Sequence, residues 1–343
     1  MNGVCCLVSH LNKIWSHMNI FHRLINWIRL RNYKSLKINN AIFIYDPNFD
    51  PGIREYYLYI SRLLINALQG SNAKCIINFG LRKLKLIRQN IPVISIDFQI
   101  EHTLVKPGGR GGEHAPVGKI GIRGDPDSQY LCRIANYHML NGQDIVIEYS
   151  RINLVNIRLS GIYKEYLNKS FLIAPTLYHL KSYSQDDQRQ YDTITLFQNP
   201  EEPRRKKFTL TLTARNVRFE NRNNIFDNLD SVYLKTKILI NIRQTDFHDT
   251  LEELRILPAL RCGVIVISED SPLKECCMYS EFILWEKLEN LPDLILDVQR
   301  NYQAYHKKIF GHPKFYTRMN RLSTANQLMA IRIRKKIESL VQG

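Results

Sequence analysis

Residues 235–272, KTKILINIRQTDFHDTLEELRILPALRCGVIVISEDSP, decide the fold of this chain. KILINIR is an apolar run of strand length, and the β-branched run VIVIS follows Gly263. Between them, TLEELRILPALRC has leucines at positions 251, 254, 257 and 260, which is helical spacing. Two buried-type strands joined by a helix form a right-handed βαβ unit with parallel strands. The helix start and the strand ends then meet at one edge of the sheet, where open α/β sheets bind ligands.

Strands and helices alternate in the same way through the rest of the chain. Strand-like runs lie at 41–45, 75–79, 92–98, 144–150, 170–175, 193–197 and 216–219, and FILWE follows the opening stretch. Helical spacing is found at 53–67, 81–89, 130–140 and 294–309, and another helix begins near Arg204. We therefore predict an α/β protein with two Rossmann-like domains of parallel sheet and covering helices. The polar stretch at 181–192 is the expected linker.

The positive charge is concentrated at the two ends of the chain. The net charge is +16, of which residues 1–40 contribute +6 and residues 300–343 contribute +9. The body between them carries only +1, which argues against a nucleic-acid groove through the fold and favours a local anionic contact. Both ends have helical apolar spacing, so an anionic membrane surface or a protein partner is the expected contact. For the first thirty residues, a helix docked on its own domain is the favoured alternative.

Four segments follow from these patterns. They are a basic helical segment over 1–40, an N-terminal domain over 41–180, a C-terminal domain over 190–310 and a basic helix over 311–343. The first thirty residues contain no uncharged span of transmembrane length and no signal-peptide order. Seven cysteines without CxxC spacing are typical of core residues in a reducing compartment. We expect a cytoplasmic protein that can associate peripherally with a membrane.

The segment HDTLEELRILPALRCGVIVISEDSP (248–272) resembles the donor site of GT-B-fold glycosyltransferases, in the broad group 1 class and its spore-maturation-protein-like relatives. Their pattern is a strand, a loop, a helix with Glu near its start, a small residue and Gly, and a β-branched strand ending in Ser or Thr. The resemblance continues through FILWEKLENLPDLILDVQRNYQAY and covers roughly residues 190–310. It implies a GT-B architecture with terminal helices that cross back to the N-terminal domain.

The resemblance also implies a set of donor-binding residues. Glu253 would bind the donor ribose, and the amides of Thr250 and Leu251 would face the donor phosphates. Ser268 ends the strand, and Glu269 in the following loop would border the sugar. From spacing alone, Thr250 and Glu253 instead form a T-x-x-E capping box at the helix start, which occupies the same carboxylate.

The stereochemistry of transfer does not follow from the resemblance. Many retaining members have a second Glu eight residues before the ribose-binding one, and Thr245 stands at that position here. The paired glutamates are therefore absent, and a retaining reaction cannot be carried over.

The basic run Arg204 to Lys207 opens the helix after the strand at 193–197. In similar proteins, a basic residue at this place neutralises the donor diphosphate, and the planar fork of arginine matches phosphate oxygens. We choose Arg205 for this role, with Arg204 as an equal alternative. Lys206 and Lys207 are interpreted as a solvated helix start.

The glycine-rich stretch at 100–127 is interpreted as a mobile acceptor loop over the cleft, with Gly108, Gly109 and Arg110 at its centre. It is not a P-loop, because Gly112 and Gly118 enclose five residues where that motif has four. The alternative is a flexible surface loop.

Asp97 and His102 follow an expected strand and are the candidate general bases for removing a proton from the acceptor hydroxyl. Glu101 has the same placement, and Glu113 and His114 are more distant candidates. The structural alternatives are that Asp97 caps the loop and that His102 is a satisfied core histidine.

The predicted function is transfer of a sugar from a nucleotide-sugar donor to a glycan or other hydroxyl acceptor, in the cleft between the domains. We expect no metal and no other cofactor, because no metal-ligand spacing is evident and a helix start with arginines can stabilise the charge. The alternatives are a non-catalytic GT-B scaffold, a basic protein that binds nucleic acid or an anionic surface, and a sugar-nucleotide epimerase or phosphorylase on the same architecture.

Overall fold

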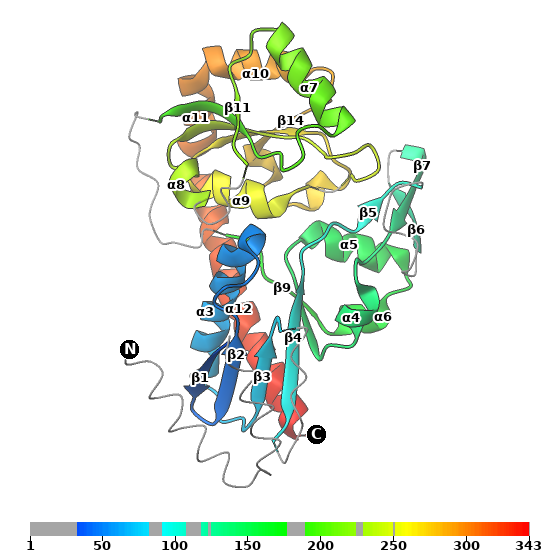
Figure 1. Cartoon of the computed structure of the whole chain (residues 1–343), viewed down its shortest axis with the longest axis vertical. Coiled ribbons are helices and arrows are strands. Elements are labelled where there is room, and N and C mark those ends of the chain that lie inside the picture. The colour runs from blue at the N-terminus through cyan, green and yellow to red at the C-terminus, as the bar shows by residue number, and fades with distance from the viewer. Residues whose placement is uncertain are drawn as a thin grey trace.

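The computed structural model describes residues 33–81, 91–107, 118–122, 125–176, 189–223, 229–249 and 251–342. They form two α/β domains placed end to end, with a long C-terminal helix beside both (Figure 1). Each domain has its own largely parallel sheet and its own apolar core. The predicted fold class, two α/β domains with parallel sheets, is confirmed.

The N-terminal domain is built on a six-stranded sheet with the order β1-β2-β3-β4-β8-β9. Its strands are β1 (Lys34–Ile38), β2 (Ala41–Tyr45), β3 (Ile76–Phe79), β4 (Val93–Gln99), β8 (Ile145–Glu148) and β9 (Ser170–Leu172). The single turn η1 (Pro51–Ile53) precedes α3 (Arg54–Leu68), and the other described helices of the domain are α4 (Tyr137–Asn141), α5 (Arg151–Ser160) and α6 (Lys164–Asn168). Every residue of β8 is buried, as expected for an inner parallel strand covered on both faces.

Strand β1 differs from the helical segment predicted over 1–40. It pairs antiparallel with β2 at the edge of the sheet. Lys34, Leu36 and Lys37 are exposed, and Ile38 is buried. Exposed lysines on an edge strand discourage pairing with another chain. The part of the predicted helix within residues 1–32, and the helix predicted at 81–89, fall on residues that the structure leaves undescribed, apart from Leu81.

A small antiparallel sheet occupies much of the region predicted to be a long loop and a helix. Its order is β5-β7-β6, with β5 (Leu104–Val105), β6 (Gly118–Ile122) and β7 (Asp125–Cys132). The prediction of a helix across 130–140 was wrong for its first half, because Tyr130 and Cys132 are buried together with Leu104. Buried side chains two residues apart are typical of a β-strand. Helix α4 begins only at Tyr137.

The C-terminal domain is built on a five-stranded parallel sheet with the order β11-β10-β12-β13-β14. Its strands are β10 (Tyr191–Thr195), β11 (Glu220–Asn221), β12 (Thr236–Asn241), β13 (Ile265–Glu269) and β14 (Ile283–Glu286). Its helices and turns are α7 (Pro203–Ala214), α8 (Leu229–Tyr233), α9 (Glu253–Arg261), η3 (Lys274–Cys276), η4 (Ser280–Phe282), α10 (Leu291–Arg300) and α11 (Tyr302–Phe310). The βαβ unit predicted from residues 235–272 is therefore present as β12, α9 and β13.

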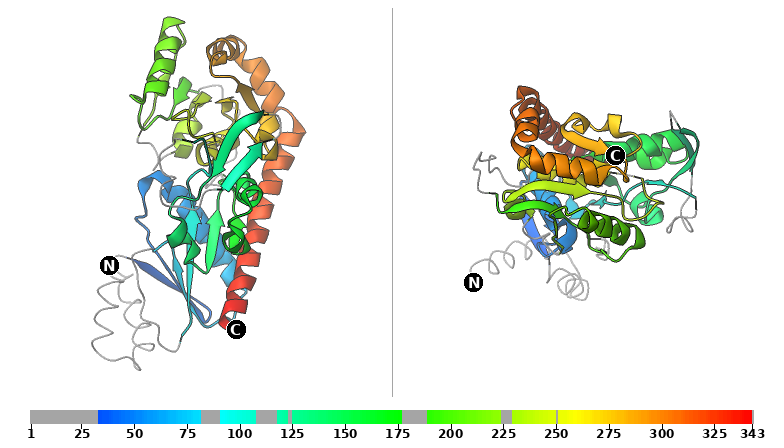
Figure 2. Two further views of the ribbon diagram at one scale, coloured as in Figure 1. Left: turned by 90° about the vertical axis from the view of Figure 1, so that its right-hand side faces the viewer. Right: turned by 90° about the horizontal axis from the view of Figure 1, so that it is seen from above.

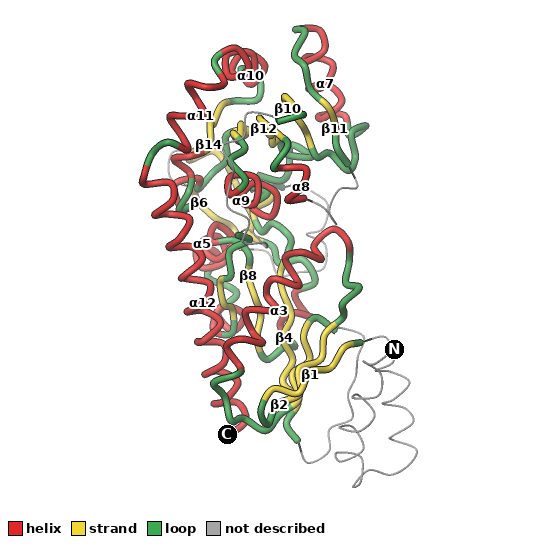
Figure 3. The backbone as a smooth tube through the Cα atoms, turned by 90° about the vertical axis from the view of Figure 1, so that its left-hand side faces the viewer, coloured by secondary structure: helices red, strands yellow, loops and turns green. Residues whose placement is uncertain are grey.

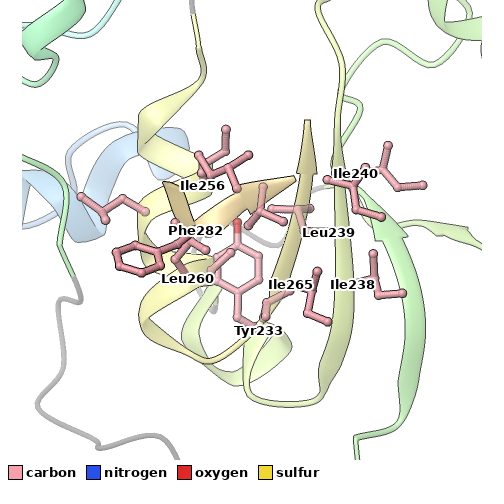
Figure 4. Close-up of a cluster of buried hydrophobic side chains, with 14 of the residues drawn as sticks. Tyr233, Ile238, Leu239, Ile240, Ile256, Leu260, Ile265 and Phe282 are labelled. Carbon is pink, nitrogen blue, oxygen red and sulfur yellow. The ribbon is translucent and has the colours of Figure 1, made fainter. Parts of the chain in front are cut away.

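The core of this unit explains why its pattern was readable. Ile256 and Leu260 of α9 gather with Leu239 and Ile265 of the two strands (Figure 4). Full burial of such a side chain stabilises the fold by about 1.5–3 kcal/mol. Gly263 ends the unit's helix with φ of 73°, a left-handed conformation that favours glycine.

Helix α12 (Pro313–Gln342) connects the two cores. Phe315, Met319 and Leu322 belong to the C-terminal core, whereas Ile333 and Ile337 belong to the N-terminal core. The helix lies along one side of the molecule (Figure 2) and packs beside α3 (Figure 3). The prediction that the C-terminal helix crosses back to the N-terminal domain is confirmed.

Asn326 fixes the point at which α12 crosses between the domains. Its side-chain oxygen accepts a hydrogen bond from the Ala174 amide at 2.9 Å, and its amide group donates to the Ala174 carbonyl at 2.8 Å. It also donates to the Tyr59 hydroxyl at 2.9 Å.

The predicted helix at 294–309 is two helices, α10 and α11, because Asn301 between them has non-helical dihedral angles. None of the described helices is long and apolar enough to cross a membrane.

Candidate functional site

The strand order points to one edge of the C-terminal sheet as the ligand site. Along the chain, β11 follows β10 on one side and β12 returns to pair with β10 on the other side. Ligands of open α/β sheets bind at such a reversal, outside the carboxyl ends of the strands. The parallel strands of the N-terminal sheet lie in sequence order and have no such reversal. The elements beside the reversal are α7, which follows β10, and the loop from β12 to α9.

Arg205 is the most unusual residue at this edge. It is 2% exposed, and its guanidinium carbon lies 4.6 Å from the centre of the Phe197 ring. Among the described residues, none forms an ion pair with it or accepts a hydrogen bond from it, and its Nε is buried. Burial lowers its pKa to about 10, and the neighbouring Arg255 contributes in the same direction. A buried cation in this state favours an anionic ligand, because unpaired buried charge is costly.

Arg204 was the equal alternative to Arg205 in the sequence. In the structure it already forms ion pairs with two carboxylates. Its Nη1 donates to Glu269 at 2.8 Å, and its Nε donates to Asp246 at 2.6 Å. Arg243 also pairs with Glu269, at 2.6 Å, and with the buried Asp249. Glu269 is 4% exposed, so its charge is compensated by two arginines at the end of β13. The immediate role of Glu269 is therefore to hold Arg204 and Arg243 in place.

Ser268 and Leu251 are both buried at the same edge. The Ser268 hydroxyl accepts a hydrogen bond from the Asn241 side chain at 3.0 Å and donates to the Glu269 carbonyl at 3.1 Å. Leu251 is 2% exposed within the C-terminal core, and its carbonyl accepts from the Glu253 amide at 2.9 Å. Thr250 lies outside the described residues, as do Gly108, Gly109 and Arg110 of the predicted acceptor loop.

The small sheet of the N-terminal domain docks directly against this edge. The Lys106 amide donates to the Phe247 carbonyl at 2.8 Å, and Val105 and His248 form an antiparallel bridge. The Tyr130 hydroxyl donates to the Asp249 carboxylate at 2.5 Å. The stretch predicted as an acceptor loop thus supplies a strand that contacts the β12–α9 loop of the other domain.

Glu253 is held in the junction between the domains. One carboxylate oxygen accepts from the hydroxyl of Ser150, which belongs to the N-terminal domain, and the other accepts from the Tyr279 hydroxyl at 2.5 Å. The side chain is 3% exposed, and burial raises its pKa to about 7. The predicted capping box was wrong, because α9 begins at Glu253 itself and its N-cap is Glu252. Each carboxylate oxygen therefore already accepts one hydrogen bond from a buried hydroxyl.

Glu148 is a second buried carboxyl beside the junction, and no pattern in the sequence indicated it. It ends β8 and accepts from the Tyr149 amide at 3.1 Å, the Ser150 amide at 3.3 Å and the Asn153 side chain at 2.9 Å. Burial raises its pKa well above the usual range, and the charge of Glu253 acts in the same direction. Burial therefore shifts both carboxyls toward the neutral form.

Glu252 has the opposite environment to its neighbour. Its side chain is 33% exposed, and the Nε of Arg255 lies 3.7 Å from its carboxylate. Arg255 lowers its pKa, and His102, Arg205 and His248 are close enough to act in the same direction. Glu252 is therefore the ionised carboxylate among groups from both domains. Sequence alone could not separate it from Glu253, since the residue at which α9 begins decides which of the two is buried.

His102 lies at the same junction. Its ring centre is 4.4 Å from that of His248, in an edge-to-face arrangement. His248 is fixed by Thr245 at 2.7 Å and by Arg133 at 3.5 Å. The Nε2 of His102 is buried and has no hydrogen-bond partner among the described residues. Burial, followed by His248, lowers its pKa to about 4, so the ring is neutral at neutral pH, and the charge of Glu252 acts in the opposite direction.

Asp97 is placed differently from His102. It is 1% exposed within β4, paired in register with Val146, and its carboxylate accepts from the Phe98 amide at 2.8 Å. The groups that feel its charge include Tyr57 and Tyr166 of the N-terminal domain. The structure therefore brings His102 together with Glu252 and Arg205 but leaves Asp97 inside the sheet.

Two further features of the described residues bear on ligands. No group of three or more histidine, cysteine, aspartate or glutamate side chains there is arranged to hold a metal ion. An open cavity of about 690 Å³ lies at the amino ends of the C-terminal strands, and Asp192, Asn216 and Arg218 are among its lining residues. That cavity is at the opposite end of the strands from Arg205.

No family model matches the chain, and no curated protein matches it. Among solved structures, the glycotransferase of kitacinnamycin is similar at 10% sequence identity, with a TM-score of 0.38, over 87% of this chain and 84% of that one. A likeness of this size is a coarse one of overall shape.

Proposed function

We propose that this protein is a glycosyltransferase that transfers a sugar from a nucleotide-sugar to a hydroxyl acceptor. The observation that carries the proposal is Arg205, a buried guanidinium without an anionic partner among the described residues, at the carboxyl edge where the strand order reverses. A diphosphate supplies the missing negative charge. The resemblance of residues 248–272 to GT-B donor sites supports the same assignment.

In this proposal, the donor diphosphate binds between Arg205 and the start of α9. The first backbone amides of a helix lack partners within the helix, and the helix dipole favours an anion there. The Leu251 amide lies in the loop just before this helix start, two residues ahead of Glu253. Arg204 and Arg243 lie at the same edge, where Glu269 holds both guanidinium groups in place. We expect no metal in this arrangement, since cationic side chains stabilise the leaving group.

The chemical step that fits these residues is a direct displacement. The acceptor oxygen attacks the anomeric carbon, and its proton passes to the Nε2 of His102. The bond between the anomeric carbon and the diphosphate oxygen breaks, and the nucleoside diphosphate leaves with the electron pair next to Arg205. Glu252 is placed to stabilise the imidazolium of His102 as it forms, because its charge raises the pKa of that ring.

A thermal-shift screen against nucleotide-sugars and nucleoside diphosphates tests the donor site. A ligand that binds the native state raises the unfolding midpoint. Arg205→Met should abolish that shift, and the ligand-free variant should be as stable as the parent or more so, because an unpaired buried charge is removed. Lys207→Met, an exposed change on the same helix, should leave the shift intact. Failure of every nucleotide to stabilise the parent chain refutes the proposal.

Product analysis then separates transfer from the non-catalytic alternative. Release of a nucleoside diphosphate together with a glycosylated acceptor supports transfer, and His102→Gln should lower turnover without weakening donor binding. A chain that binds nucleotide-sugars but releases no sugar with any hydroxyl acceptor would be a scaffold. Interconversion of the donor sugar without transfer would indicate an epimerase.

A further inference from the structure

The outward face of α12 has a composition that the packing of the two domains does not explain. The helix buries one face against both cores, with residues such as Met319, Ala330 and Ile337. On the opposite face, Leu328 is 56% exposed and Ile331 is 37% exposed. Arg321, Arg332 and Lys335 are exposed on the same side of the helix. Apolar and cationic side chains thus alternate along an uncovered ridge.

The cations of this ridge are not neutralised within the described protein. Lys314 and Arg318 at the start of α12 pair with Glu281, and Arg334 pairs with Glu338. Among the described residues, none forms an ion pair with any of the three cations that flank Leu328. Joining the two domains accounts for the buried face of α12, and it leaves the cluster of Leu328, Ile331 and three cations facing outward.

We propose that the outward face of α12 is a docking surface for an anionic lipid membrane. The flanking cations meet the lipid phosphates and carboxylates, while Leu328 and Ile331 enter the boundary between headgroups and acyl chains. Charge complementarity selects an anionic surface, and the central leucine selects one with an accessible apolar layer. Helix α12 lies along the outer side of the molecule, so its ridge can approach a flat surface (Figure 2). This inference does not depend on the chemistry of the donor site.

Co-sedimentation of the full chain with vesicles tests the proposal. The chain should sediment with vesicles of phosphatidylcholine mixed with phosphatidylserine, and it should stay in solution with phosphatidylcholine alone. Each cation near an anionic surface contributes about fivefold in affinity, so Arg332→Gln with Lys335→Gln should weaken binding by about 25-fold. Leu328→Ser should weaken binding without changing its dependence on salt.

The matched control is Lys206→Gln with Lys207→Gln on α7. That helix also presents two exposed lysines and an exposed leucine, Leu210, but it is short, and Glu201 pairs with one of the lysines. The control should bind the mixed vesicles like the parent chain. Equal loss in the α7 and α12 variants, parent-like binding by the α12 variant, or no binding by the parent chain would each overturn the proposal. All these positions are exposed, and circular dichroism checks that each variant is folded.

Discussion

Glu253→Gln should remove a large part of the pH dependence of stability between pH 5 and pH 8. Burial raises the pKa of Glu253 from 4.5 to about 7 in the folded protein. The folded state therefore holds the proton more tightly than the unfolded state. The stability that this group contributes is complete below about pH 4.5 and is lost as the pH rises through about 7. Glutamine cannot ionise, so the variant escapes this loss.

The expected magnitude follows from the two pKa values. Their separation corresponds to about 3 kcal/mol in the free energy of unfolding. Because part of this change has already occurred by pH 5, the difference between variant and parent should become about 2.5 kcal/mol more favourable to the variant at pH 8 than at pH 5. Glutamine retains one carbonyl oxygen, which can accept from Ser150 or Tyr279, so the variant should still fold. Urea denaturation at several pH values measures the difference.

Glu252→Gln is the matched control, at the adjacent residue. Arg255 lowers the pKa of Glu252, so its favourable contribution is present above its ordinary pKa and is lost only as the pH falls below that range. The difference between this variant and the parent should stay constant from pH 5 to pH 8. A constant difference for Glu253→Gln over the same range would refute the reasoning, because it would show that Glu253 is ionised in the folded protein throughout.

Three further predictions concern particular contacts. Gly80→Ala should destabilise the protein more than Gly161→Ala in thermal unfolding: both glycines have positive φ, but a Cβ at 80 would lie 2.8 Å from a tyrosine ring, whereas 161 faces open space. The change at 161 should cost about 1 kcal/mol. Asn326→Leu should cost about 2–5 kcal/mol by leaving a buried amide and carbonyl unpaired, measured by urea denaturation with Asn326→Asp for comparison. The ring signals of His102 in NMR should not titrate between pH 5 and pH 8, and Glu252→Gln should lower its pKa further.

Local periodicity made the fold predictable. A parallel strand covered on both faces must be apolar along its whole length, and a helix on a sheet must be apolar every three or four residues. Both requirements are met within 235–272, so β12, α9 and β13 could be predicted from that stretch alone. The amphipathic pattern of α12 was readable for the same reason, although its two halves pack on different cores.

The misread segments show where periodicity is ambiguous. Tyr130 and Cys132 belong to a run whose apolar spacing fits both a helix and a strand. Hydrogen bonding with β5, which is distant in the chain, stabilises the strand. Residues 118–122 were also misread, because their glycines predicted a loop. Hydrogen bonds with β7 give them an ordered backbone that no local signal indicates.

Local patterns in the sequence indicated two arginines after one strand, two glutamates at a helix start and a histidine after a strand of the other domain. The properties that distinguish these residues depend on contacts between segments that are distant in the chain. Arg204 is neutralised by Glu269 from another strand, so Arg205 is the buried arginine without a partner among the described residues. Glu253 is buried against Ser150, whereas Glu252 is partly exposed and lies beside Arg255, which lowers its pKa. The reason is physical: the charge and availability of a side chain depend on burial and on partners distant in sequence, which periodicity does not encode.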